Sequence, residues 1–101
     1  MVRPKKCKMV DAVPGVTYFK PRAIPLTDLK EVELTVEEFE AIRLKDFKGL
    51  EQEEASKTMG ISQPTFHRLI ISARRKIAEA LVEGKAIKIN GGDYSLSKKK
   101  R

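Results

Sequence analysis

Apolar residues recur at helical spacing in two long stretches of the sequence, and these stretches predict amphipathic helices. The first opens with Thr35 and Glu38 at the spacing of a capping box, and Gly49 is expected to end it. Leu34, just before the cap, is placed to pack against Phe39 as a hydrophobic staple. The apolar face of this helix is expected to consist of Val36, Phe39, Ile42 and Phe47.

The second stretch predicts a long helix that begins after Ser62, its N-cap, and continues to about Glu83, before Gly84. Pro64 fits into its first turn, because the amides of that turn have no partner within the helix. At 1.5 Å per residue the helix would be roughly 33 Å long. Its apolar positions are Phe66, Leu69, Ile70, Ala73, Ile77, Ala80 and Leu81.

A shorter helix is expected between these two, from about Leu50 to Met59, with Gly60 at its end. Residues 16–19 (VTYF) and 85–89 (KAIKI) have the composition and alternation of short strands, which are expected to pair with each other or across a dimer. Residues 26–34 are ambiguous between a helical turn and an extended segment. The predicted parts are a flexible basic arm (1–8), a turn-rich segment with a short strand (9–34), a three-helix domain (35–83), a C-terminal strand (84–92) and a disordered basic tail (93–101).

The boundary between the second and third predicted helices has the pattern of a helix-turn-helix corner. Ser56 is small where the two helices would touch, and Gly60 follows four residues later in the turn. Met59 and Ile61 flank the glycine as apolar plugs, and the second helix of the corner is anchored by Phe66 and Leu69. We therefore predict a mainly α fold, a three-helix helix-turn-helix domain with two short flanking β-strands.

The net charge of +7 is distributed unevenly along the chain. Residues 31–54 hold nine acidic and three basic side chains, whereas residues 57–76 hold five basic ones and no acid. This polarisation and the basic ends indicate a polyanionic partner, although terminal lysine runs alone could equally serve solubility. The basic arms consist of Arg3, Lys5, Lys6, Lys8, Lys98, Lys99, Lys100 and Arg101.

Several classes of protein are disfavoured by what the sequence contains. Its apolar runs are too short for a transmembrane helix, and the basic N-terminus lacks the apolar core of a secretory signal. A single cysteine, Cys7, forms no internal disulfide framework, which fits a cytoplasmic protein. With one histidine and no glycine-rich phosphate loop, we expect no metal, no cofactor and no enzymatic activity.

From Leu34 to Leu81 the chain resembles the region-four DNA-binding domain of bacterial sigma factors. The shared features are the LT-x-x-E opening, RL near the end of the first helix, GL before the second, GIS at the turn and ARRKI near the end. The segment starts without a preceding polymerase-binding domain, so we do not expect a complete sigma factor. Sigma-like sequences often place serine at the N-cap of the second helix, where this chain has Glu51.

Over almost its whole length the chain also resembles a family of small uncharacterised archaeal and bacterial proteins described as predicted DNA-binding proteins. The motifs that carry this resemblance are RPKKC near the start, PGVTYFKP at 14–21, IPL at 24–26, GLEQEEA at 49–55 and GKAIKINGG at 84–92. The resemblance implies a helix-turn-helix fold and no particular target or reaction.

In the docking expected of such a corner, the start of the third helix enters the major groove of DNA. Gln63 would then read adenine and Arg68 guanine. His67 is expected in contact with DNA or simply exposed, and Ile71 against a thymine methyl, a partner subunit or solvent. The residues facing base edges are Gln63, Pro64, His67, Arg68 and Ile71. The expected phosphate contacts are Gln52, Ser62, Thr65, Arg74, Arg75 and Lys76, the last three alternatively forming a solvated face.

The function predicted from these features is sequence-specific binding of double-stranded DNA by a transcriptional regulator. The alternative is a protein-interaction or RNA-binding module built on the same sigma-like corner. Because one such unit contacts only a few base pairs, a homodimer is expected, with the transcription machinery as a further candidate partner.

Overall fold

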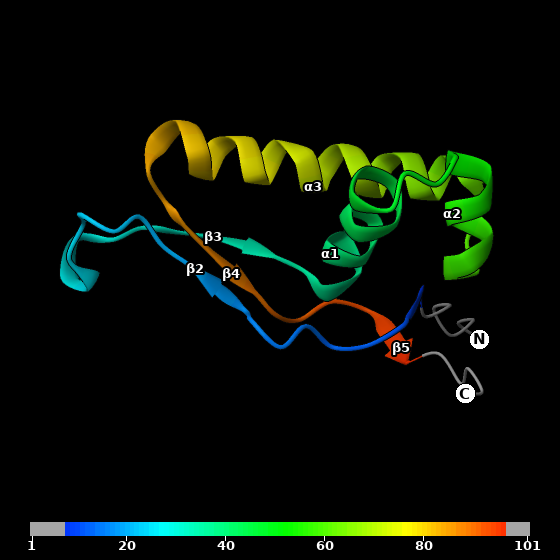
Figure 1. Ribbon diagram of the computed structural model, residues 1–101, viewed down its shortest axis with the longest axis horizontal. Coiled ribbons are helices and arrows are strands. Elements are labelled where there is room, and N and C mark those ends of the chain that lie inside the picture. The colour runs from blue at the N-terminus through cyan, green and yellow to red at the C-terminus, as the bar shows by residue number, and fades with distance from the viewer. Residues whose placement is uncertain (1–7, 97–101) are drawn as a thin grey trace, which may run out of the picture.

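The structure, a computed structural model, describes residues 8–96. It is a small domain of three helices and short strands, arranged along the longest helix (Figure 1). The helices are α1 (Val36–Ile42), α2 (Gln52–Met59) and α3 (Gln63–Glu83), with a 3-10 turn η1 (Leu26–Asp28) and a π-helical turn η2 (Arg43–Phe47). The strands are β1 (Lys8–Val10), β2 (Tyr18–Phe19), β3 (Glu31–Leu34), β4 (Ala86–Ile89) and β5 (Tyr94–Leu96).

The first helix starts as its capping pattern predicts. The amide of Glu38 donates to Thr35 Oγ1 at 3.1 Å, and the amide of Thr35 donates to Glu38 Oε1 at 2.9 Å. The helix is regular only to Ile42, because the next turn widens into η2, in which the Lys48 amide donates to the Arg43 carbonyl. The predicted helix of residues 35–48 is therefore an α-helix followed by a π-helical turn.

The turn between α2 and α3 also has the predicted chemistry. Gly60 adopts φ +69°, a left-handed conformation that residues with a Cβ rarely adopt, and the amide of Ile61 donates back to the Ser56 carbonyl. Ser62 caps α3 by accepting the Thr65 amide at 3.2 Å, and Pro64 lies in the first turn. Below, the corner of α2 and α3, residues 52–83, is called the α2–α3 unit.

The core lies where α3 crosses α1 and α2, and its centre is the apolar stripe of α3. Phe66 and Ala73 are fully buried, as are Ala55 and Met59 of α2. Ser56 is also buried, so a small side chain does lie between the two helices. Leu69 and Ile77 are half-buried at the margin of the same core. The positions expected to anchor α3, Phe66 and Leu69, are thus confirmed.

Two predicted core positions are wrong. The side chains of Phe47 and Leu81 are 84% and 76% exposed. Phe47 is the last residue of the π-helical turn, in which Leu44 is the residue that reaches the core. Leu81 is exposed because the sheet beneath the last turns of α3 covers Ala80 and leaves the adjacent face open.

The described residues contain five strands instead of the two predicted, and these form a three-stranded sheet and a separate two-stranded sheet. The expected pairing of residues 16–19 with 85–89 is confirmed: β2 and β4 are antiparallel, with Phe19 opposite Ile87. The ambiguous segment 26–34 forms η1 and then β3, which runs parallel to β4. In Figure 1 this three-stranded sheet lies beside the C-terminal half of α3, whereas α1 and α2 lie beside the N-terminal half.

The two outermost strands correct the prediction for both ends of the chain. Lys8, assigned to a flexible arm, begins β1, and residues 94–96, assigned to a disordered tail, form β5 parallel to it. Gly92 makes the approach to β5 possible, because a Cβ there would collide with the side chains of Thr35 and Glu37. The ladder of β1 and β5 could not be predicted, because each strand is only three residues long.

Candidate nucleic-acid interface

The start of α3 holds a chain of polar side chains on its exposed side. Ser62 Oγ donates to Thr65 Oγ1 at 2.9 Å, and Arg68 Nη2 donates to the same Thr65 oxygen at 3.4 Å. The three residues follow one another at three-residue spacing, which places them on one side of the helix. The N-cap hydroxyl and Thr65 thereby orient the Arg68 guanidinium along the helix surface.

The outward face of α3 continues from there as a shallow cationic hollow of about 370 Å³. His67, Arg68 and Ile71 are all exposed along it, and Ile71 is 48% exposed. Arg75 follows one turn further on, and among the described residues it has no carboxylate within salt-bridge distance. The hollow is lined by His67, Arg68, Ile71, Ser72 and Arg75. Ile71 thus lies between two cations that have no carboxylate partner among the described residues, and such a surface is suited to a polyanion that also offers apolar groups.

The three helices differ in the charge of their first turns. The first turn of α1 contains Glu37 and Glu38, and that of α2 contains Glu53 and Glu54. Such carboxylates neutralise the positive end of the helix dipole. The first turn of α3 contains no acid, so no carboxylate of its own neutralises the positive end of its dipole.

Lys76 lies inward, unlike the other cations of α3. Its Nζ donates to Glu38 Oε1 at 2.8 Å, and Ser72 Oγ donates to Glu38 Oε2 at 2.6 Å. Burial alone would raise the pKa of Glu38, but hydrogen bonds from Lys76, Ser72 and Thr35 outweigh it and lower that pKa. The carboxylate is therefore ionised and joins α3 to the start of α1. Lys76 is occupied within the protein, whereas the sequence pattern had assigned it to phosphate.

Arg74 is held in the same manner at the protein surface. Its Nε and Nη2 donate to the two oxygens of Asp46 at 3.0 Å and 2.6 Å. This paired hydrogen bond raises the pKa of Arg74 and lowers the pKa of Asp46. Because Asp46 lies in the π-helical turn, the wide turn of η2 places a carboxylate against α3. Of the three neighbouring cations 74–76, only Arg75 is left without such a partner in the described chain.

The start of α2 does not resemble a phosphate site. Gln52, predicted to contact phosphate, is half-buried, and the exposed side chains around it are acidic: Glu51, Glu53 and Glu54. Glu53 is partly compensated by Lys57 at 3.7 Å, but Glu51 and Glu54 are not paired to a described cation. Their charge disfavours a phosphate within reach of Gln52.

Of the residues predicted to form the basic arms, Lys8 alone lies within the described part of the chain. Lys8 lies in β1 with its Nζ 3.8 Å from Glu37 Oε2. β1 also lies beside the turn of the α2–α3 unit, since a Cβ on Gly60 would be 3.7 Å from Met9 Sδ. Both β1 and β5 therefore lie near the corner. The other predicted arm residues, Arg3, Lys5, Lys6, Lys98, Lys99, Lys100 and Arg101, lie outside the described residues.

Sequence reasoning missed the residues that hold α3 in place. Glu38 was recognised only as part of the capping box, and Ser72 and Asp46 carried no signal. The capping glutamate turns one oxygen to its own helix and to Lys76, and the other to Ser72. A lysine on the inner flank of the helical period, opposite a capping-box glutamate, is the pattern that would have indicated this contact.

Residues 8–96 contain neither a membrane-spanning helix nor a cluster of metal-ligating side chains. No helix there is long and apolar enough to cross a membrane. No group of three or more histidine, cysteine, aspartate or glutamate side chains in this part of the chain is arranged to hold a metal ion.

Comparison with known proteins identifies relatives but no described activity. The family model "Protein of unknown function DUF134" matches residues 1–97. A UPF0251 protein of Moorella thermoacetica is 60% identical over 96 residues, 95% of this chain and 64% of its own length. UPF0251 protein TTE1845 of Caldanaerobacter subterraneus is 62% identical over 96 residues, 95% of this chain and 81% of its own length. The chain thus spans less than two thirds of the Moorella relative. No solved structure matches the chain.

Proposed function

The chain belongs to the family of proteins of unknown function DUF134, and we propose that it is a sequence-specific double-stranded DNA-binding protein that regulates transcription. In this proposal the α2–α3 unit is a helix-turn-helix of the sigma region-four type, and α3 enters the major groove. The observation that carries the proposal is the outward face of α3, where His67, Arg68, Ile71 and Arg75 are exposed beside a first turn without acids.

The exposed side chains suit the two tasks of a DNA-binding helix. Arg68 is long enough for paired hydrogen bonds to guanine, Gln63 for adenine, and Ile71 for contact with a thymine methyl group. His67 and Pro64 complete the face toward the bases. Ser62, Thr65 and the amides of the first turn are suited to a phosphate, as is Arg75. We assign Arg74 and Lys76 to positioning α3, because both are held by carboxylates of the protein.

The remaining expectations follow from this role and are part of the proposal. Two copies would read two half-sites, and the basic arms would add sequence-independent attraction to phosphates. The transcription machinery is a candidate partner, the cytoplasm is the expected compartment, and no enzymatic reaction is assigned.

The decisive experiment is a selection of bound sequences from random duplexes, followed by measurement of affinity for the selected site at several salt concentrations. Arg68→Ala is expected to lose about 1–3 kcal/mol of discrimination at one base pair. Arg75→Ala is the control, expected to weaken selected and unselected duplexes alike. Equal behaviour of the two variants would contradict the assigned roles.

The same measurement with unrelated RNA separates the proposal from its alternative. Binding to RNA as tight as to the selected duplex, unaffected by Arg68→Ala, would indicate an RNA-binding module. If no nucleic acid competes at moderate salt, the exposed face of α3 would instead be assigned to a protein partner.

A further inference from the structure

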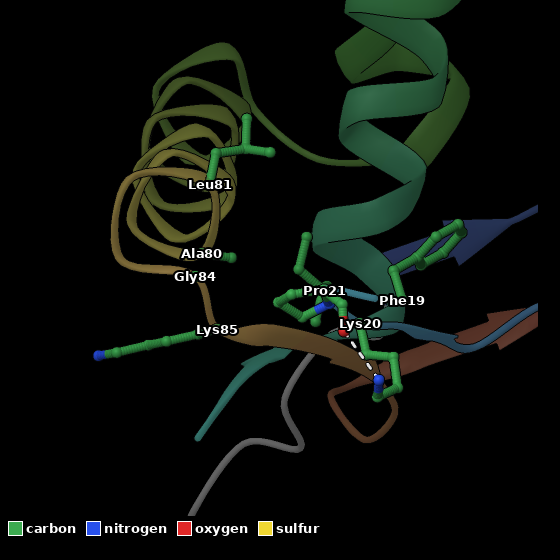
Figure 2. A pocket seen from close by; sticks show the side chains of 8 residues that line it. Phe19, Lys20, Pro21, Ala80, Leu81, Gly84 and Lys85 are labelled. Atoms are coloured by element: carbon green, nitrogen blue, oxygen red, sulfur yellow. Dashed lines mark hydrogen bonds between the residues drawn. The ribbon is translucent and has the colours of Figure 1, made fainter. Parts of the chain in front are cut away.

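Two places in residues 8–96 stand out as unsatisfied, one apolar and one charged. The apolar one is a hollow of about 280 Å³ between β2 and the end of α3, with Phe19, Pro21 and Leu81 along it (Figure 2). The charged one lies at the start of α1, where Glu37 Oε1 is buried without a hydrogen-bond partner. A buried polar atom without a partner costs free energy, whereas apolar surface in contact with water is common. The Glu37 carboxylate is therefore the more unusual feature.

Glu37 lies beneath the place where the two ends of the described chain meet. Below, the seam denotes β1, β5 and residues 91–93, which lead into β5. Lys8 Nζ of β1 lies 3.8 Å from Glu37 Oε2, and the Gly91 carbonyl accepts the amide of Val36 at 3.1 Å. Gly92 passes directly over the carboxylate, because a Cβ there would collide with Glu37 Oε1. The seam thus encloses the side chain, and Glu37 is only 7% exposed.

The next carboxylate on this side of α1 is fully partnered. Glu40 follows Glu37 by three residues and is 2% exposed. Arg43 donates to both of its oxygens at 2.8 Å, and the amide of Asp11 donates to Oε2 at 3.3 Å. Helix α1 therefore holds the end of β1 near a satisfied carboxylate, whereas the start of β1, at Lys8, meets an unsatisfied one.

The surroundings of Glu37 favour its neutral form. Burial raises the pKa of Glu37, and the Asp93 carboxylate adds to the increase, whereas Lys8 and the backbone of Glu37 and Asp93 act against it. The charged groups that meet Glu37 from the packed elements are thus Lys8 of β1 and Asp93 of the segment before β5. The adjacent Glu38 is engaged elsewhere, with Lys76 of α3.

We propose that Glu37 is a proton-sensitive latch, which holds the seam closed more tightly when its carboxyl group is neutral than when it is ionised. Inside the closed seam an ionised Glu37 has one oxygen without a donor, whereas in an opened seam water donates to both oxygens. The pKa of Glu37 is close to its ordinary value of 4.5 when the seam is open and higher when it is closed. The contribution of Glu37 to closure is therefore fully present below pH 4.5 and is lost as the pH rises through the higher value.

Opening of the seam would affect the α2–α3 unit. Val10 of β1 is 1% exposed and belongs to the same core cluster as Met59 of α2. Met9 lies at the turn of the unit, since a Cβ on Gly60 would be 3.7 Å from Met9 Sδ. An opened seam removes this packing, so the ionisation of Glu37 controls how firmly the corner is supported. This inference does not depend on what the corner binds.

Hydrogen exchange of the full chain, followed by NMR at pH 7 and at about pH 4, tests the latch. The reporter is the Val36 amide, which donates to Gly91 of the seam, and the reference is the amide of Ala73 in the buried stripe of α3. Glu37→Gln keeps the size of the side chain and removes its charge. At pH 7 it is expected to raise the protection factor of Val36 relative to Ala73 by about five-fold or more. At about pH 4 the ratio of variant to wild type should approach one, because wild-type Glu37 is then largely neutral as well.

Glu40→Gln is the matched control, because it makes the same change three residues further along α1 at a satisfied carboxylate. It is expected not to raise the protection of Val36 at either pH. Lys8→Gln removes the cation that favours ionised Glu37, so it should lower the protection of Val36 at pH 7 and have a smaller effect at about pH 4.

Three results overturn the proposal. The first is a Val36 amide that is less protected in Glu37→Gln than in wild type at pH 7. The second is a ratio of Glu37→Gln to wild type that is the same at both pH values, and the third is an equal increase in Glu40→Gln. Circular dichroism verifies that each variant is folded. A Glu37→Gln variant that does not fold contradicts the latch as well, since the neutral side chain is expected to stabilise the seam.

Discussion

The two halves of α3 differ in what they rest on and in what they expose. The N-terminal half, residues 63–76, crosses α1 and α2 and exposes cationic side chains, among them Arg68 and Arg75. The C-terminal half, residues 77–83, rests on the sheet and exposes Leu81 and Val82 with two glutamates. One continuous helix thus exposes cationic side chains along its first part and apolar and acidic ones along its last turns.

The halves also differ in how firmly they are attached. The N-terminal half is held by Lys76 on Glu38 and by Arg74 on Asp46, in addition to Phe66 in the core. Among the described residues, the ion pairs of the C-terminal half are confined to Lys85 with Glu79 and Glu83, which lie six and two residues before it in sequence. The base reading proposed for the N-terminal half would require a precisely oriented helix. The difference indicates that charge here is used to orient one half only.

The largest effect is expected when the attachment of the N-terminal half is removed. Glu38→Ala leaves Lys76 and Ser72 without their acceptor and should lower the free energy of unfolding by about 2–4 kcal/mol, somewhat less than the roughly 3–5 kcal/mol of a fully buried pair, because Lys76 is 33% exposed. Urea unfolding measures this loss. Glu54→Ala, a change at an exposed helical glutamate, should stay within about 0.5 kcal/mol. A similar loss in both variants would refute the role of Glu38.

A smaller effect is expected on DNA affinity when Arg75, which has no described carboxylate partner, is compared with Arg74, which is paired with Asp46. Arg75→Ala should lower the slope of log affinity against log salt by about one, as expected for one lost phosphate contact. Arg74→Ala should leave this slope nearly unchanged and instead cost about 0.2–1 kcal/mol of stability, because its exposed pair with Asp46 is lost. Fluorescence anisotropy titrations over a salt series measure the two slopes, and urea unfolding measures the loss of stability. A steeper loss in Arg74→Ala than in Arg75→Ala would reverse the assignment.

The smallest effect is expected from pH. The folded-state pKa of Glu38 lies below its ordinary value of 4.5, so its contribution to stability is present above pH 4.5 and is lost as pH falls through the folded-state pKa. Burial raises the pKa of Glu37, so the effect of Glu37 on stability changes with pH in the opposite direction. The pH dependence of wild-type stability alone would therefore combine the effects of Glu37 and Glu38. The difference in unfolding free energy between wild type and Glu38→Gln isolates Glu38, and it should shrink as the pH falls below 4.5. A difference that does not change with pH would exclude an ionised Glu38.

Much of the helical part could be predicted because its signals are local. The capping box at Thr35, the turn glycine Gly60 and the N-cap Ser62 satisfy backbone groups within a few residues, and all three occur as expected. The pairing of β2 with β4 was also predictable, since both segments have strand composition. The segments β1 and β5 were not, because three residues of mixed polarity become a strand only when a partner strand lies beside them.

The candidate site also has a part that could be predicted from local signals and a part that could not. Periodicity placed His67, Arg68 and Ile71 on the outward side of α3, since the side of a helix on which a residue lies follows from its spacing to the core positions. Periodicity could not distinguish Arg75 from its neighbours Arg74 and Lys76, whose partners come from residues 28 and 38 positions away. It also placed Leu81 in the core, although the element beneath that turn covers only Ala80.

The amino-acid sequence therefore determined where α1 and α3 begin and where the chain turns between α2 and α3, because caps, glycines and apolar period act over a few neighbouring residues. Only the tertiary structure decided which cations of α3 remain free and which of its apolar side chains remain exposed. Both depend on the approach of segments that are distant along the chain: the π-helical turn that carries Asp46, the buried Glu38 of α1, and a sheet whose outer strand extends beyond the helix.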